Sequence, residues 1–163
     1  MIRDVVEIFE HFMEQALIEA QAAYDKDEVP VGAIVVLNGI IIGRGHNCRE
    51  TTNDPTMHAE IIAIREASQN LKSWRLTGCE LFVTLEPCPM CAGAIIQSRI
   101  DRVVFGAFDP KAGCAGTLYN LLSDIRFNHR AEIVAGVLEK ECADLLRRFF
   151  RDKRNKASRE NPL

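Results

Sequence analysis

Apolar residues recur at three- and four-residue intervals near the start of the chain, which predicts an amphipathic helix over residues 8–25. Two apolar runs follow, residues 31–37 and 40–43, and Asn38-Gly39 between them is typical of a tight β-hairpin turn. A polar stretch, residues 46–55, predicts a loop. Asp54-Pro55-Thr56 then indicates a helix start, and we expect that helix over residues 57–71.

The second half alternates between strand-like and helix-like segments. We predict strands at residues 80–85, 102–107 and 132–137 and helices at residues 89–97 and 139–156, whereas residues 118–128 fit either type. Apolar positions at helical spacing predict a buried stripe on the last helix, formed by Cys142, Leu145, Leu146, Phe149 and Phe150. This alternation predicts a layered α/β domain that opens with a hairpin.

Length and composition narrow the class of protein. A chain of 163 residues has the size of one domain, and we find no repeat or linker, so we expect residues 1–163 to form a single domain. No apolar run reaches the roughly 18 residues of a membrane span, and the first residues include acids where an export signal would be basic. We therefore expect a soluble cytoplasmic protein with no membrane partner and with six reduced cysteines.

The formal net charge of −3 hides an uneven distribution. Residues 147–159 hold seven basic side chains and one acid, a net +6, so the rest of the chain carries −9. Such a segment suits an anionic partner, although a solvated terminal helix is an equally ordinary explanation. The mild overall charge therefore does not exclude nucleic acid.

Two short motifs have residues with metal-binding chemistry. His58-Ala59-Glu60 and Pro87-Cys88-Pro89-Met90-Cys91 each lie where a helix is predicted to begin. Zinc accepts imidazole nitrogen and thiolate sulfur, and a helix N-terminus stabilises thiolates. His58, Cys88 and Cys91 would supply three ligands, and no fourth is obvious. Three protein ligands with one position left for water are typical of catalytic zinc.

Glu60 gives such a water a use. A carboxylate two residues beyond the histidine can lie beside the water without binding the metal, and can transfer its proton to a ring nitrogen and a leaving group. The prediction is hydrolytic deamination of an amidine-like ring carbon. The alternatives are a redox-active Cys-x-x-Cys, which leaves His58 and Glu60 unused, and a structural four-ligand site that recruits another cysteine or His46.

The two motifs together resemble the signature of zinc-dependent nucleobase deaminases, and the surrounding sequence resembles bacterial tRNA-specific adenosine deaminases. The matching segments, which extend over about residues 12–153, are residues 30–33, 45–47, 58–60, 84–95, 102–107, 109–113, 128–130 and 149–151. Cys114, where the family pattern has alanine, is a small departure. The resemblance implies a cytidine-deaminase-like three-layer α/β/α sandwich with a five-stranded mixed sheet. It also implies a cytoplasmic homodimer that converts the wobble adenosine of a tRNA anticodon to inosine, in bacteria typically that of an arginine tRNA.

The resemblance also implies roles for individual residues. His58, Cys88 and Cys91 would bind one Zn²⁺, and Glu60 would transfer protons. Further positions would contact the nucleoside or form its pocket: Asn47, Val31, Gly32, Ala33 and Ala59. The backbone carbonyl of Pro87 would receive the departing ammonia. For Asn47, a side chain that only caps its own loop is the alternative.

An anticodon stem-loop would need a surface for phosphates and bases beyond the pocket. Arg151 beside Phe150 on the last helix is one candidate, and Asp109 in the glycine-containing loop of residues 108–117 is the other. A core position for Phe150 and a plain connecting loop are the corresponding alternatives. At the level of function, a deaminase of a free base or nucleotide such as guanine or cytosine, and a non-catalytic zinc or RNA-binding protein, compete with the tRNA enzyme.

Overall fold

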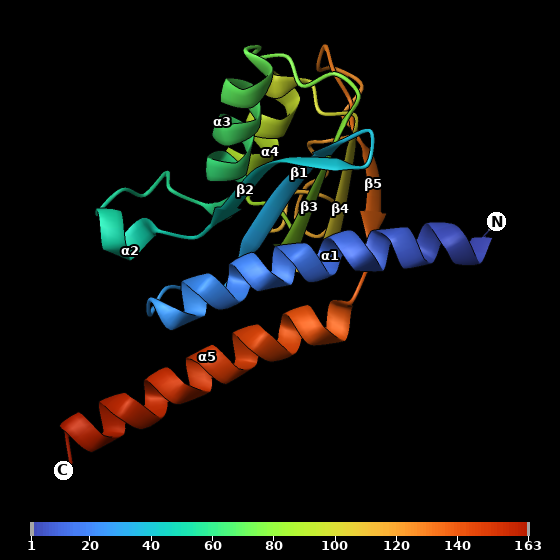
Figure 1. Ribbon diagram of the computed structural model, residues 1–163. Helices are drawn as coiled ribbons and strands as arrows, with labels where there is room; N and C mark the ends of the chain where they lie inside the picture. Colours follow the sequence, from blue (N-terminus) through green and yellow to red (C-terminus); the bar gives the residue numbers. More distant parts are fainter. Residues whose placement is uncertain (1, 163) are drawn as a thin grey trace.

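A five-stranded mixed sheet forms the centre of the protein in the computed structural model, which describes residues 2–162 (Figure 1). The strands are β1 (Gly32–Leu37), β2 (Ile40–His46), β3 (Cys79–Leu85), β4 (Arg102–Ala107) and β5 (Glu132–Ala135). Their order across the sheet is β2-β1-β3-β4-β5. β1 runs antiparallel to both β2 and β3, whereas β3, β4 and β5 are parallel. The predicted five-stranded mixed sheet is confirmed.

Helices cover both faces of the sheet (Figure 1). One face packs against α3 (Ala59–Leu71) and α4 (Pro89–Ser98), and the other against α1 (Ile2–Asp25) and the first part of α5 (Glu139–Glu160). Two buried apolar clusters fill the space on either side, one beneath α3 and α4 and one beneath α1 and α5. This arrangement is the expected three-layer α/β/α sandwich. No helix in residues 2–162 is long and apolar enough to cross a membrane.

Glycines in β2 let α3 lie close to the sheet. A Cβ added at Gly43 would lie 2.2 Å from the carbonyl oxygen of Ala63, and one at Gly45 would lie 2.4 Å from that of Ala59. Both distances are far below van der Waals contact, so only glycine permits this approach. The close packing fixes the N-terminus of α3, where His58 stands, against the end of β2.

The hairpin and the two motif-bearing helices form as predicted. Asn38 and Gly39 both adopt positive φ, 50° and 78°, as the tight turn between β1 and β2 requires. His58 and Cys88 are the N-cap residues of α3 and α4, and Pro89 occupies the first turn of α4.

Several predicted boundaries were wrong. α1 begins at Ile2, six residues before the predicted start; its first turns carry apolar residues at helical spacing, but Val5 and Val6 are each 49% exposed. The predicted loop of residues 46–55 contains a short helix, α2 (Arg49–Thr52), and α3 starts at Ala59 rather than at residue 57. Residues 118–128 form neither a helix nor a strand.

The last helix differs from the prediction in its exposure. α5 runs to Glu160, and its second half extends beyond the sheet (Figure 1). Cys142 and Phe149 are buried, but Phe150 is 45% exposed, so its predicted place in a buried stripe was wrong. Phe149 still packs against Tyr24 of α1 at this level, so Phe150 is exposed because it lies on another side of the helix.

Candidate active site

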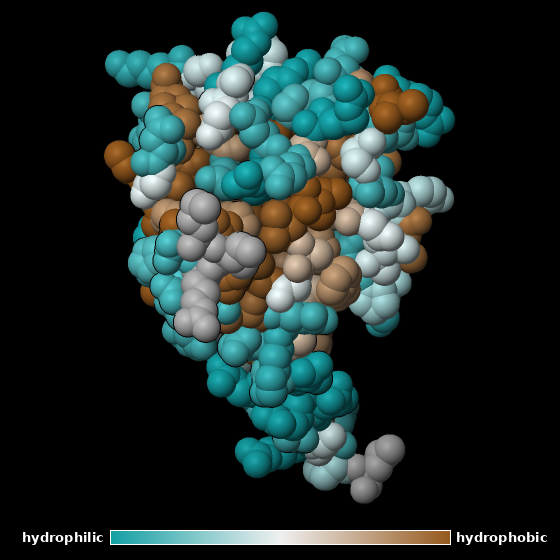
Figure 2. Space-filling model, turned by 90° about the vertical axis from the view of Figure 1, so that its right-hand side faces the viewer, coloured by the Kyte–Doolittle hydropathy of each residue, from teal (hydrophilic) through white to brown (hydrophobic). Residues whose placement is uncertain are grey.

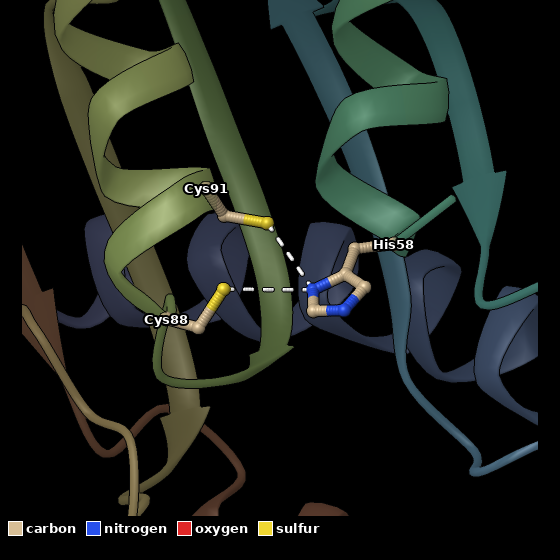
Figure 3. A group of neighbouring side chains, drawn as sticks. All are labelled: His58, Cys88 and Cys91. Carbon is tan, nitrogen blue, oxygen red and sulfur yellow. Dashed lines mark hydrogen bonds between the residues drawn. The ribbon is translucent and has the colours of Figure 1, made fainter. Parts of the chain in front are cut away.

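His58, Cys88 and Cys91 point toward one another from the starts of two neighbouring helices (Figure 3). The Nδ1 atom of His58 lies 3.5 Å from the Sγ atom of Cys88 and 3.5 Å from that of Cys91. Cys91 is fully buried, and the other two side chains are partly buried. The three residues that the sequence assigns to a metal thus lie together in the structure, and their binding of a metal stays a prediction.

The spacing of the three donor atoms fits a zinc ion. Ligands at about 2.0 Å for nitrogen and 2.3 Å for sulfur, placed at a tetrahedral angle, lie about 3.5 Å apart. The observed separations match that value, and one imidazole with two thiols is a donor set that zinc accepts. Within residues 2–162, this is the only cluster of His, Cys, Asp or Glu donors close enough to share one ion.

The protonation of the two cysteines is coupled through a hydrogen bond. The Cys91 thiol donates to Cys88, and this bond, opposed by burial and assisted by His58, lowers the pKa of Cys88 to about 4. The same hydrogen bond, together with burial, raises the pKa of Cys91. The bond to Cys88 also raises the pKa of His58. Cys88 is thus the thiol that ionises more readily of the two. A cysteine binds a metal as its thiolate.

Glu60 lies in the first turn of α3, with its side chain directed to the same cavity. It is 3% exposed, and its Oε1 atom has no hydrogen-bond partner among the described residues. Burial raises the pKa of this carboxyl to about 7. A buried, unpaired carboxyl oxygen that gains and loses a proton near neutral pH has the properties of a general acid–base group.

A cavity of about 220 Å³ opens in front of these groups. Predicted site residues in its wall are Val31, Asn47, His58, Ala59, Glu60, Cys88 and Asp109. Asn47 is 8% exposed; its side-chain amide donates to the carbonyl of Val29, and its oxygen accepts the N–H of Arg49. Asn47 therefore caps its own loop and also lines the cavity.

Other predicted residues lie outside this wall. Gly32 and Ala33 are buried in β1, where Gly32 packs against the backbone of α1. The Pro87 carbonyl accepts the N–H of Cys114 at 2.8 Å. Phe150 and Arg151 are exposed on α5. Substrate contact at these five positions stays a prediction.

The cavity also has wall residues that the sequence did not indicate, namely Val29, Arg49, Leu85, Glu86 and Ala112. Arg49 is the first residue of α2, a helix in a polar stretch that was predicted to be a loop. A second buried carboxylate, Glu28, accepts the N–H groups of Glu50 and Thr51 at 2.8 and 3.2 Å and so holds α2 in place. The sequence around Arg49 does not indicate a place in the cavity wall, and the sequence around Glu28 does not indicate that it holds α2, because the partners come from distant parts of the chain.

Comparison with known proteins agrees with this geometry. The model of the MafB19-like deaminase family matches residues 9–154. A tRNA-specific adenosine deaminase of Bacillus subtilis (strain 168) is 57% identical over 154 residues, which cover 93% of this chain and 96% of that protein. The chain belongs to the tRNA-specific adenosine deaminase family.

Three further proteins show how far the similarity of this deaminase extends. An Agrobacterium fabrum tRNA-specific adenosine deaminase is 48% identical over 88% of this chain and 95% of its own length. A solved structure from a study of A-to-I editing by tRNA:A34 deaminases superimposes with a TM-score of 0.80 at 46% identity, covering 83% of this chain and 98% of that one. A guanine deaminase from Nitrosomonas europaea has a TM-score of 0.76 at 25% identity, over 86% of this chain and 83% of that one.

Proposed function

We propose that this protein deaminates adenosine to inosine at the wobble position of a tRNA anticodon, and that its substrate is an arginine tRNA. The observation that carries the proposal is the convergence of His58, Cys88 and Cys91 beside the buried carboxyl of Glu60, whose Oε1 atom has no hydrogen-bond partner among the described residues. The family membership supplies the substrate class, since relatives at 57% and 48% identity are tRNA-specific adenosine deaminases.

His58, Cys88 and Cys91 would hold one Zn²⁺ per chain. When bound, zinc supplies Lewis acidity that makes water a nucleophile at neutral pH. The partly buried placement of two ligands and the full burial of the third leave the cavity side of the cluster open to substrate. Three protein ligands and one open side are typical of a catalytic rather than a structural zinc site.

Glu60 transfers the protons of the reaction. Its carboxylate accepts a proton as water adds to the carbon that carries the amino group, and delivers it to the neighbouring ring nitrogen. It then assists proton transfer to the amino group, which leaves as ammonia while the ring carbonyl of inosine forms. A pKa of about 7 lets the carboxyl act in both directions near neutral pH.

The cavity wall would orient the nucleoside, and Asn47, Val31, Ala59 and Asp109 all line it. Gly32 and Ala33 support Val31 from within β1. The Pro87 carbonyl keeps a second lone pair beside its bond to Cys114 and could accept a hydrogen bond from the leaving ammonia.

The RNA around the wobble base would contact α5 and the loop of residues 108–117. Arg151 and Phe150 are both exposed on α5, which offers a cation beside an aromatic face. An anticodon base is splayed out more easily than a base in a duplex, so a cavity of this kind suits a single-stranded loop.

We further propose that residues 1–163 form a single domain, as the length and the lack of a linker indicate, and that two chains form a homodimer in the cytoplasm, as the resemblance implies. Light scattering on the purified protein measures the mass directly. A mass near twice 18.3 kDa supports the dimer, and a mass near 18.3 kDa contradicts it.

Incubation with defined substrates tests the proposed activity. The substrates are an anticodon stem-loop of arginine tRNA with a wobble adenosine, a matched stem-loop of another tRNA, free guanine and free cytidine. Inosine in the first RNA alone supports the proposal. Turnover of guanine or cytidine without turnover of RNA would favour the free-base alternative, to which the guanine deaminase neighbour at 25% identity points.

A further inference from the structure

Glu86 follows β3 directly and precedes the metal-ligand segment, yet nothing in the proposed chemistry uses it. It is 2% exposed and borders the cavity. A carboxylate at such a depth is costly unless several donors satisfy it, so its partners indicate what it does.

The hydrogen-bond partners of the Glu86 carboxylate belong to one loop, residues 109–117, whereas the backbone N–H of Glu86 donates to the carbonyl of Ala107 in β4. Oε1 accepts the N–H of Asp109 at 3.1 Å and the hydroxyl of Thr117. Oε2 accepts the N–H groups of Ala115 and Thr117, each at 3.1 Å. The carboxylate thus connects both ends of the loop to the end of β3.

The backbone of this loop also packs directly on the carboxylate. A Cβ added at Gly113 would lie 2.5 Å from the Cδ atom and from both carboxyl oxygens of Glu86. The next residue, Cys114, donates its N–H to the carbonyl of Pro87 at 2.8 Å. Two consecutive residues, Glu86 through its carboxylate and Pro87 through its carbonyl, therefore hold the backbone of the loop.

The same loop supplies Asp109 and Ala112 to the cavity wall. The Asp109 side chain accepts the N–H groups of Lys111 and Ala112 at 3.0 and 3.2 Å, which continues the ordering from Glu86 toward the cavity. A displacement of the loop would therefore move the wall that faces the substrate without altering the metal ligands.

We propose that Glu86 is a positioning residue of the deaminase, which holds the loop of residues 109–117 as one wall of the substrate cavity. The inference rests on the proposed function, because that wall is assigned to nucleoside and RNA contact. Only a carboxylate meets the need, since three of its four partners are N–H groups that can only donate.

Glu86→Gln tests this role with almost no change in volume. The amide oxygen can serve Ala115 and Thr117, but the amide nitrogen then faces the N–H of Asp109 and cannot accept it. We expect KM for the anticodon stem-loop to rise about tenfold, the effect of one lost hydrogen bond, with a smaller change in kcat. Zinc content should equal that of the wild type.

The matched control is Glu80→Gln, on the same strand but partly exposed and paired with Arg102. It should leave KM unchanged. A fall in kcat with KM unchanged for Glu86→Gln would contradict the inference, because loss of folded enzyme lowers the active fraction without changing the affinity of what remains.

Gly113→Ala approaches the same contact from the loop, and it leaves Glu86 and its charge intact. Its backbone lies outside the positive-φ region, so the added Cβ acts only through the contact with the carboxylate. We expect the same rise in KM. Unchanged KM in this folded variant would overturn the inference even if Glu86→Gln folded poorly.

Amide hydrogen exchange gives a readout that does not depend on activity. In Glu86→Gln without RNA, amides of residues 109–117 should exchange about tenfold faster, and those of β3 at the wild-type rate. Unchanged loop exchange would overturn the inference whatever substrate the enzyme uses. If the loop loosens but the wild type makes no inosine, the proposed function fails and the loop-holding role stands.

Discussion

His58 and Cys88 occupy the same structural position, the N-cap residue of a helix, in α3 and α4. Neither side chain caps its own helix, so both are directed to the cluster they form with Cys91. This placement could be predicted from the sequence, because each motif follows a turn or a strand end and precedes a helical pattern. The position of Glu60 in the first turn of α3 could be predicted in the same way.

The supporting carboxylates could not be predicted in this way. Glu28 and Glu86 look like ordinary surface acids in the sequence, but both are almost fully buried. Their partners are backbone N–H groups 22 to 31 residues away, which only the folded chain brings together. A sequence pattern gives side-chain types and spacings, and it contains no information on such long-range backbone contacts.

Removal of a metal ligand tests the cluster residue by residue. Cys91→Ala should reduce bound zinc, measured per chain by mass spectrometry, to near zero. In the wild type, a chelator should lower the melting temperature, since metal at about 100 times its dissociation constant stabilises a fold by about 2.7 kcal/mol. Cys91→Ala should show no such response. Cys48→Ala, outside the cluster, is the control, and loss of zinc in that variant instead would contradict the assignment.

At the scale of elements, the contact between α3 and the sheet determines where the site lies. Gly45→Ala forces a Cβ to within 2.4 Å of the backbone oxygen of Ala59, at the start of α3. We expect this overpacking to lower the free energy of unfolding by about 3 kcal/mol, measured by urea denaturation. Gly93→Ala, in α4 with no atom of the chain within 4 Å of the added Cβ, should instead stabilise by about 0.5–1 kcal/mol. Equal effects of the two changes would contradict this account.

The errors at the element scale have two physical sources. Hydrophobic periodicity identified α1, α3, α4 and α5, because each has a stripe that faces the sheet. It missed α2, a single polar turn whose stability comes from Glu28 and not from an apolar face. It also placed Phe150 in the core, because the sequence does not show which of two adjacent apolar side chains, Phe149 or Phe150, faces α1.

The second half of α5 offers a test of RNA contact. Arg147 pairs with Asp144, and Lys153 pairs with Asp27, whereas Arg151 and Arg154 have no ion-pair partner among residues 2–162. Replacing Arg151 and Arg154 by glutamine should weaken stem-loop binding and reduce the slope of log affinity against log salt by about 0.7 per lost phosphate contact. Lys140→Gln, at the start of the same helix, is the control. An unchanged slope would mean that this segment is only solvated.

At the scale of the whole molecule, charge is unevenly distributed, with an excess of basic residues in the C-terminal part of α5. The basic C-terminal part of α5 forms a narrow hydrophilic extension from the body of the protein (Figure 2). The net charge of −3 therefore averages an acidic catalytic body and a basic arm. An anionic RNA experiences the local field of the arm and not the average.

Buried thiols make the free energy of unfolding fall at alkaline pH. Burial raises the pKa of Cys142 to about 12 and that of Cys79 to about 11, from 9.0 in the unfolded chain. Their contribution to stability is complete below pH 9 and is lost as pH rises toward 11–12, because the unfolded state ionises first. Denaturation curves between pH 8 and pH 11 should show this fall. Cys142→Ala should show a shallower decline, and a decline as steep as the wild type's would contradict the assignment.

In the proposed reaction, the histidine–cysteine cluster binds zinc while Glu60 transfers protons in the deamination of a wobble adenosine. The most direct measurement is inosine formation in the anticodon stem-loop by wild type and Glu60→Gln, with zinc per chain counted in the same samples. We predict one zinc in both proteins, inosine with the wild type, and a loss of at least about a hundredfold in rate with the variant. Inosine at the wild-type rate from Glu60→Gln, or loss of zinc in that variant, would contradict the account.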